Sequence, residues 1–241
     1  MTQLLISVKN VEEATLVLAS SVDIIDLKDP NMGALGALEL NISIEIIRLV
    51  KGSKLISATV GEHHESLQAL ILAIQQRAAI GVDVIKIAIS DCFYHADFID
   101  EMLRLSQPTI KIVAVFFADG ATDLNLLPKL RQAGFYGAML DTQHKLGTQH
   151  KQHDLLSLQS KQALQLFTLS CQQHQLTCGL AGSLKPQYVD ALLEINPTYI
   201  GFRGGVCDNL DRKSALNQDK LAQVVNMLRN GNKNNINPQL I

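Results

Sequence analysis

The feature that most constrains the fold is the alternation of short apolar runs with longer segments of helical spacing. Eight runs rich in valine, isoleucine and leucine have the length and composition of buried strands. They are LLISV (4–8), DIIDLK (23–28), KLISATV (54–60), DVIKIAI (83–89), IKIVAVFFA (110–118), GAMLDT (137–142), TCGLAGS (177–183) and TYIGFRG (198–204). Near-continuous apolar strands that alternate with helices are typical of parallel sheets covered by helices. Eight such units predict an α/β fold, a TIM-like (β/α)8 barrel in a single domain.

A doubly wound open sheet is the alternative fold. That fold usually carries a GxGxxG turn after its first strand, and the chain has none there. The chain has 241 residues, 47% of them hydrophobic, which is enough for one barrel with its own core. We expect a catalytic barrel domain over residues 1–229 and a polar, flexible C-terminal tail over residues 230–241.

Composition excludes several classes of function. The formal net charge is −2 and no basic stripe is present, so we expect no nucleic-acid partner. The N-terminus lacks the basic and apolar regions of a signal peptide, and the apolar runs are too short to span a membrane. We therefore expect a cytoplasmic protein with no membrane partner. The four cysteines form no CxxC pair, so neither a zinc ribbon nor a dithiol redox motif is supported.

Charged residues fall at the carboxyl ends of the predicted strands, where barrel enzymes place their catalytic groups. Asp26 and Lys28 end the second strand on one face, because side chains alternate along a strand. Lys86 lies within the fourth strand, Asp141 ends the sixth, and Lys145 follows shortly after. One interpretation is structural: buried ion pairs, Asp26 with Lys86 or Asp141 with Lys28, hold the barrel together.

Amine catalysis is the other interpretation, and three lysines at one end of the barrel favour it. A lysine is a nucleophile only when neutral, and burial and nearby cations both favour the neutral form. A neutral amine forms a Schiff base with an aldehyde or ketone, which eases proton loss from the adjacent carbon. Carboxylates or a second lysine can then move the protons.

Glycine-rich segments after the seventh and eighth strands predict the binding site of a phosphate group. In barrels the phosphate usually binds at these two loops, where glycines let backbone N–H groups approach the anion. A helix beginning near Leu184 would add its positive end, and the arginine a charge-assisted contact. The substrate expected here is a phosphorylated carbonyl compound. The predicted phosphate-binding residues are Gly182, Ser183, Arg203, Gly204 and Gly205.

Five stretches, in order along the chain, carry a family resemblance. They are DIIDLKDPNMGALG (23–36), VIKIAI (84–89), AMLDTQHK (138–145), LAGSL (180–184) and FRGGVC (202–207), the last followed by DR at 211–212. Together they resemble the (5-formylfuran-3-yl)methyl phosphate synthase family, which makes the furan precursor of methanofuran-type one-carbon carriers. The resemblance runs from about Leu4 to Leu228.

This resemblance implies a TIM-like barrel and a carbon–oxygen lyase that acts on phosphates. It implies that two molecules of glyceraldehyde 3-phosphate condense through a lysine Schiff base, with loss of one phosphate and two waters. By resemblance the Schiff-base lysine falls on Lys28 and the proton-accepting lysine on Lys86. Lys145 matches a further active-site lysine, with Asp26 and Asp141 as candidate proton carriers. No metal or organic cofactor is implied, and the only partner is a small phosphorylated aldehyde.

Two other functions fit the same residues. One is a different Schiff-base (class I) aldolase that acts on a sugar phosphate, and the other is a non-catalytic barrel that binds sugar phosphates. Release of phosphate from glyceraldehyde 3-phosphate distinguishes the synthase from both. The segment 29–36 after Lys28 is either a loop that folds over the substrate or a simple turn. The sequence leaves the oligomeric state open, and a homo-oligomer is compatible with it.

Overall fold

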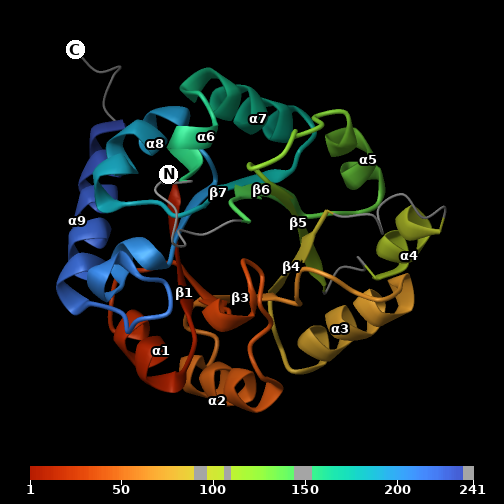
Figure 1. Ribbon diagram of the computed structural model, residues 1–241, viewed down its shortest axis with the longest axis horizontal. Helices are drawn as coiled ribbons and strands as arrows, with labels where there is room; N and C mark the ends of the chain where they lie inside the picture. Colours follow the sequence, from red (N-terminus) through yellow and green to blue (C-terminus); the bar gives the residue numbers. More distant parts are fainter. Residues whose placement is uncertain (90–96, 106–109, 144–153, 236–241) are drawn as a thin grey trace.

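The strands form a closed barrel in the computed structural model, which describes residues 1–89, 97–105, 110–143 and 154–235 (Figure 1). The strands are β1 (Gln3–Val8), β2 (Ile24–Leu27), β3 (Leu55–Thr59), β4 (Val84–Ala88), β5 (Lys111–Phe117), β6 (Gly137–Asp141), β7 (Thr177–Leu180) and β8 (Tyr199–Phe202). Each strand pairs in parallel with the next along the chain, and β8 pairs with β1. The prediction of a single-domain (β/α)8 barrel is confirmed.

Helices surround the strands as an outer ring (Figure 1). They are α1 (Val11–Leu18), α2 (Leu40–Val50), α3 (Leu67–Ala79), α4 (Phe98–Leu105), α5 (Leu126–Gln132), α6 (Leu155–Leu158), α7 (Lys161–Gln173), α8 (Val189–Ile195) and α9 (Gln218–Asn235). Several begin at a capping side chain. Ser66 and Ser160 accept hydrogen bonds from backbone N–H groups in the first turns of α3 and α7. Such caps satisfy N–H groups that have no partner within the helix.

The barrel interior is filled by inward-facing side chains from alternate strand positions. One buried cluster joins Leu5, Ile24, Val84, Val113, Val115, Met139 and Tyr199. Tyr199 lies against Gly179 of the neighbouring strand, and a Cβ at Gly179 would be 2.3 Å from the tyrosine Cζ. The strand therefore needs glycine at this position, and the tyrosine ring helps to close the barrel beneath the polar end.

Short 3₁₀ turns shape the loops at the carboxyl ends of the strands. They are η1 (Pro30–Met32), η3 (Pro186–Tyr188), η4 (Gly204–Val206) and η5 (Asp208–Leu210). The helix expected near Leu184 begins later, as η3 followed by α8. Proline favours a first helical position, because its fixed φ suits the turn and it needs no N–H acceptor, so Pro186 marks the beginning.

The last helix extends beyond the predicted end of the barrel. The expected boundary at residue 229 lies inside α9, which continues to Asn235. Asn232 is buried, accepts a hydrogen bond from the Thr2 N–H (3.2 Å) and donates one to the Thr2 carbonyl (2.8 Å). Asn232 thus holds the chain that enters β1, and residues 236–241 of the predicted tail lie outside the described residues. In the described chain no helix is long and apolar enough to cross a membrane.

Candidate active site

A cavity of about 420 Å³ opens at the carboxyl ends of the strands. Its lining includes the predicted catalytic residues Lys28, Lys86, Asp26 and Asp141 and the predicted phosphate-binding residues Gly182, Ser183, Arg203, Gly204 and Gly205. The fold therefore brings these nine residues to one place. Lys145 falls within residues 144–153, which lie outside the described part of the chain.

The deepest polar group is an ion pair between Lys86 and Asp26. The Lys86 Nζ lies 2.6 Å from the Asp26 Oδ1, and the two residues are 2% and 0% exposed. Two serine hydroxyls also donate hydrogen bonds to the carboxylate of Asp26. Ser7 donates to Oδ2 and Ser57 to Oδ1, each at 2.7 Å. These bonds from β1 and β3 hold the carboxylate of Asp26 in a fixed orientation toward Lys86.

Burial and charge act in opposite directions on this pair. Burial alone would raise the pKa of Asp26, but the charges of Lys86 and Lys28, with hydrogen bonds from Lys86 and Ser7, lower it below its usual range. Burial lowers the pKa of Lys86, and the positive charge of Lys28 adds to this, although Asp26 opposes both. Asp26 is thus a stable anion, and Lys86 is an amine whose neutral form is more accessible than usual.

Lys28 forms the second pair, closer to the opening of the cavity. Its Nζ lies 3.3 Å from the Asp141 Oδ2, and the residue is 8% exposed. The other oxygen of Asp141 accepts the N–H of Thr142 at 2.8 Å. Both ion pairs of the structural interpretation are therefore present. They line an open cavity, however, where a pair with a purely structural role has no need to be.

The loop after β7 approaches the chain after β6 and the loop after β8 so closely that glycine is required at both contacts. A Cβ at Gly205 would lie 2.1 Å from the carbonyl oxygen of Leu184. Gly182 has a φ of +115°, and a Cβ there would lie 2.7 Å from the Thr142 Cγ2. The N–H groups of Gly182 and Ser183 donate no hydrogen bond to the described residues. Such backbone donors suit an anion in the cavity.

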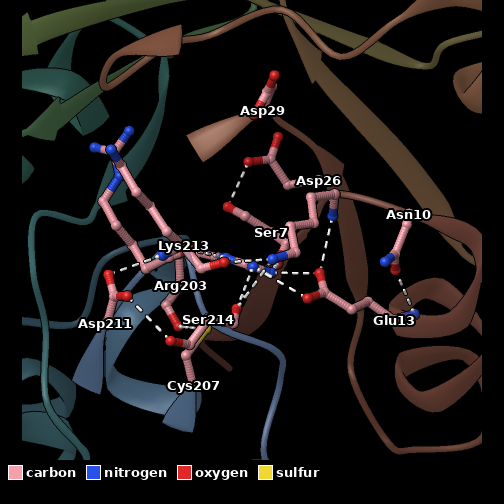
Figure 2. Close-up of polar contacts among 12 residues, drawn as sticks. Ser7, Asn10, Glu13, Asp26, Asp29, Arg203, Cys207, Asp211, Lys213 and Ser214 are labelled. Carbon is pink, nitrogen blue, oxygen red and sulfur yellow. Dashed lines mark hydrogen bonds and ion pairs between the residues drawn. The ribbon is translucent and has the colours of Figure 1, made fainter. Parts of the chain in front are cut away.

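Arg203 differs from the expected phosphate contact, because protein acceptors take all five of its N–H groups (Figure 2). Nε donates to the Arg212 carbonyl (2.8 Å) and Nη1 to the Ser7 carbonyl (3.1 Å) and the Glu13 Oε2 (2.5 Å). Nη2 donates to the Glu13 Oε1 (3.1 Å) and the Ser214 carbonyl (2.9 Å). Arg203 lines the cavity, but in this structure it has no donor left for a phosphate.

Several residues that line the cavity were not among the predicted site residues, and Ser7, Lys185 and Arg212 are three of them. Ser7 lies on β1, and its side chain faces the inside of the barrel. Alternation of side chains along the predicted strand could have identified it. The Nζ of Lys185 lies 3.6 Å from the Oδ2 of the buried Asp154, so the position of Lys185 depends on a contact between segments that are distant in the sequence. Arg212 follows the eighth strand by ten residues, too far for strand parity to place it.

The fold and the cavity define a (β/α)8-barrel protein with its polar site at the end of the strands where barrel enzymes act. A crystal structure of phosphoribosyl anthranilate isomerase from Thermus thermophilus has the same fold. Its TM-score is 0.65 at 12% identity, over 95% of this chain and 99% of that one.

The family model for 4-HFC-P synthase matches residues 4–225, and the chain belongs to this family. A protein of Methylorubrum extorquens, provisionally named (5-formylfuran-3-yl)methyl phosphate synthase, is 38% identical over 95% of this chain and 92% of its own length. The (5-formylfuran-3-yl)methyl phosphate synthase of Methanocaldococcus jannaschii is 34% identical over 88% of this chain and 92% of its own. The chain is thus an enzyme of a synthase family, as the resemblance of its motifs predicted.

Proposed function

We propose that this enzyme condenses two molecules of glyceraldehyde 3-phosphate to (5-formylfuran-3-yl)methyl phosphate, one phosphate and two waters. The name of the relatives supplies the product. Two triose phosphates supply six carbons and two phosphates, and the product keeps six carbons and one phosphate. The atoms then balance without an oxidant or a reductant. The product is a furan precursor for methanofuran-type carriers, so we place the reaction in the biosynthesis of that class of cofactor.

The observation that carries this proposal is the pair of lysines, each beside a carboxylate, in one cavity. Lys28 is the more accessible of the two and lies closer to the opening, which suits a nucleophile that must meet a substrate aldehyde. Lys86 lies deeper, and burial lowers its pKa, which suits a base that must be neutral to accept a proton.

In the proposed mechanism the neutral amine of Lys28 adds to the aldehyde carbon of one substrate and expels water. The resulting protonated Schiff base draws electrons from the adjacent carbon, whose proton passes to Lys86. The enamine that remains is a carbon nucleophile for the second substrate molecule. Asp26, a fixed anion, keeps Lys86 in place, and Asp141 orients Lys28.

The phosphate of the substrate bound to Lys28 is proposed to lie between the loops after β7 and β8. The N–H groups of Gly182 and Ser183 supply donors, Gly205 lets the second loop come close, and Gly204 is proposed as a further contact beside it. Lys145 remains a proposed active-site lysine by family resemblance.

Borohydride trapping with glyceraldehyde 3-phosphate, read by intact mass and peptide mapping, tests the mechanism. We expect a reduced adduct on Lys28 that is absent in Lys28→Ala. An adduct on Lys86 would reverse the two lysine roles. No adduct, with phosphate-dependent binding retained, would instead indicate a sugar-phosphate-binding barrel.

Release of inorganic phosphate, measured in parallel with the furan aldehyde by its ultraviolet absorbance, tests the reaction. We expect one phosphate for each furan. Schiff-base formation without phosphate release would indicate an ordinary class I aldolase.

A further inference from the structure

The loop after β8 places a second guanidinium at the cavity, that of Arg212. Its Nη2 donates to the carbonyl oxygens of Pro30 and Gly33, in the loop that follows Lys28. Within the described part of the chain, Nε and Nη1 of Arg212 make no hydrogen bond. A guanidinium has five N–H donors, so three remain for another acceptor.

The charge of this guanidinium is only partly compensated. Arg212 is half-buried, and burial lowers its pKa, opposed by the charges of Asp141 and Glu62. No salt bridge within 4.0 Å joins it to a carboxylate of the described residues. A partly desolvated guanidinium with open donors favours an anion that accepts two parallel hydrogen bonds, and phosphate has that geometry.

Arg203 and Arg212 therefore have different tasks, although both line the same cavity. Arg203 has used its donors, and two of them hold the carbonyl oxygens of Arg212 and Ser214 (Figure 2). Asp211 stiffens the same loop, since its carboxylate accepts from the Lys213 N–H (3.0 Å) and the Ser214 hydroxyl (3.0 Å). Arg203 thus fixes the backbone from which the side chain of Arg212 extends.

We propose that Arg212 binds the phosphate of the second glyceraldehyde 3-phosphate molecule and that Arg203 is its positioning residue. This assignment rests on the proposed function, because that reaction needs two phosphorylated molecules in one cavity. The two phosphates then lie on different sides of the opening. One lies between the loops after β7 and β8, and the other lies beside the loop after β2, where Pro30 and Gly33 hold Arg212.

The first test uses inorganic phosphate as the probe, titrated calorimetrically into the full chain. We expect two equivalents to bind to the wild type and one to Arg212→Gln. Lys213→Gln removes an exposed positive charge from the same loop, so this matched control should still bind two. Equal stoichiometry in Arg212→Gln and Lys213→Gln would overturn the proposal.

The second test follows furan formation as a function of glyceraldehyde 3-phosphate concentration. We expect Arg212→Gln to raise KM about tenfold or more, as loss of a charge-assisted bond predicts, and Arg212→Lys to recover part of it. Thermal unfolding should show that Arg212→Gln and Arg212→Lys are both folded, which separates lost binding from lost structure. A KM for Arg212→Gln within about twofold of that of Lys213→Gln would contradict the assignment.

A third variant, Arg203→Lys, separates positioning from folding, because lysine cannot hold five acceptors. We expect it to bind one phosphate, as Arg212→Gln does, although Arg203 has no donor for the anion itself. Two phosphates bound to Arg203→Lys would overturn its positioning role. If the wild type makes no furan yet Arg212→Gln still loses one phosphate, the proposed function and the identity of the ligand fail while the anion site stands.

Discussion

Asp26 sets the charge of the site at the scale of single residues. It raises the pKa of Lys86 through its charge and its hydrogen bond, against the effect of burial. Asp26→Asn removes that support, so the pKa of Lys86 should fall further. The neutral base would then persist to lower pH, and the acid limb of the pH profile of kcat/KM should move to lower pH.

Ser57→Ala is the matched control for this profile, since it removes one hydrogen bond to Asp26 and leaves both charges in place. We expect its acid limb to lie near that of the wild type. An acid limb that stays fixed or moves to higher pH in Asp26→Asn would place the catalytic base on another residue.

The same ion pair gives a prediction for stability. Lys86→Met leaves Asp26 as a buried anion beside two serines and should lower the free energy of unfolding by about 3–5 kcal/mol. The double variant with Asp26→Asn removes both charges and should be less destabilised than Lys86→Met alone. Urea unfolding at neutral pH measures the three values. A double variant as unstable as the sum of the single variants would show that the two residues are not coupled.

The alternation of side chains along a strand explains which site residues the sequence could predict. Asp26, Lys28 and Lys86 lie on short strands, where alternation places each side chain inside or outside the barrel. The task of Arg203 could not be found in this way. Its five acceptors come from β1, α1 and the loop at 212–214, and only the folded chain brings these segments together.

At the scale of elements, the Arg203–Glu13 pair joins the end of β8 to α1. Glu13 also accepts the N–H of Lys9 at 2.9 Å, so its carboxylate holds both the beginning of α1 and the loop after β8. Glu13→Gln leaves a largely buried guanidinium without its counter-charge and should cost about 3 kcal/mol of stability. Hydrogen exchange should show faster opening of amides in residues 204–216.

Glu12→Gln is the matched control for this variant, because Glu12 is the exposed neighbour on the same helix turn. We expect it to leave exchange in residues 204–216 unchanged. Equal exchange in Glu12→Gln and Glu13→Gln would show that the pair does not hold the loop.

Element boundaries were less predictable than the elements themselves. All eight strands occur where their apolar runs predict, because a buried parallel strand needs that composition along its whole length. Two boundaries differ from the predictions: the helix expected near Leu184 begins at Pro186, and α9 continues to Asn235, past the expected boundary at residue 229. One depends on the turn that Pro186 begins, and the other on a contact of Asn232 with a residue at the opposite end of the chain.

At the scale of the whole molecule, α9 helps to close the barrel between its first and last strands. Asn232→Ala removes two hydrogen bonds to the backbone of Thr2 and should lower stability by about 1–3 kcal/mol, the cost of a buried group left unsatisfied. Asn230→Ala changes an exposed asparagine on the same helix and should be neutral. Thermal unfolding measures both variants. Equal Tm values would show that the contact of Asn232 with Thr2 does not stabilise the fold.

The contact between Asn232 and Thr2 also places the last helix beside the segment that enters the first strand. A flexible linker from residue 235 to residue 2 would join the last helix to the first strand, and the exposed turn at residues 51–53, on the face away from the site, offers a place for new ends. We expect a circular permutant that begins at Ser53 to fold and to retain phosphate binding, measured by circular dichroism and calorimetry. Phosphate binding would then depend on how the eight units are arranged in the barrel, and not on the order in which they are translated.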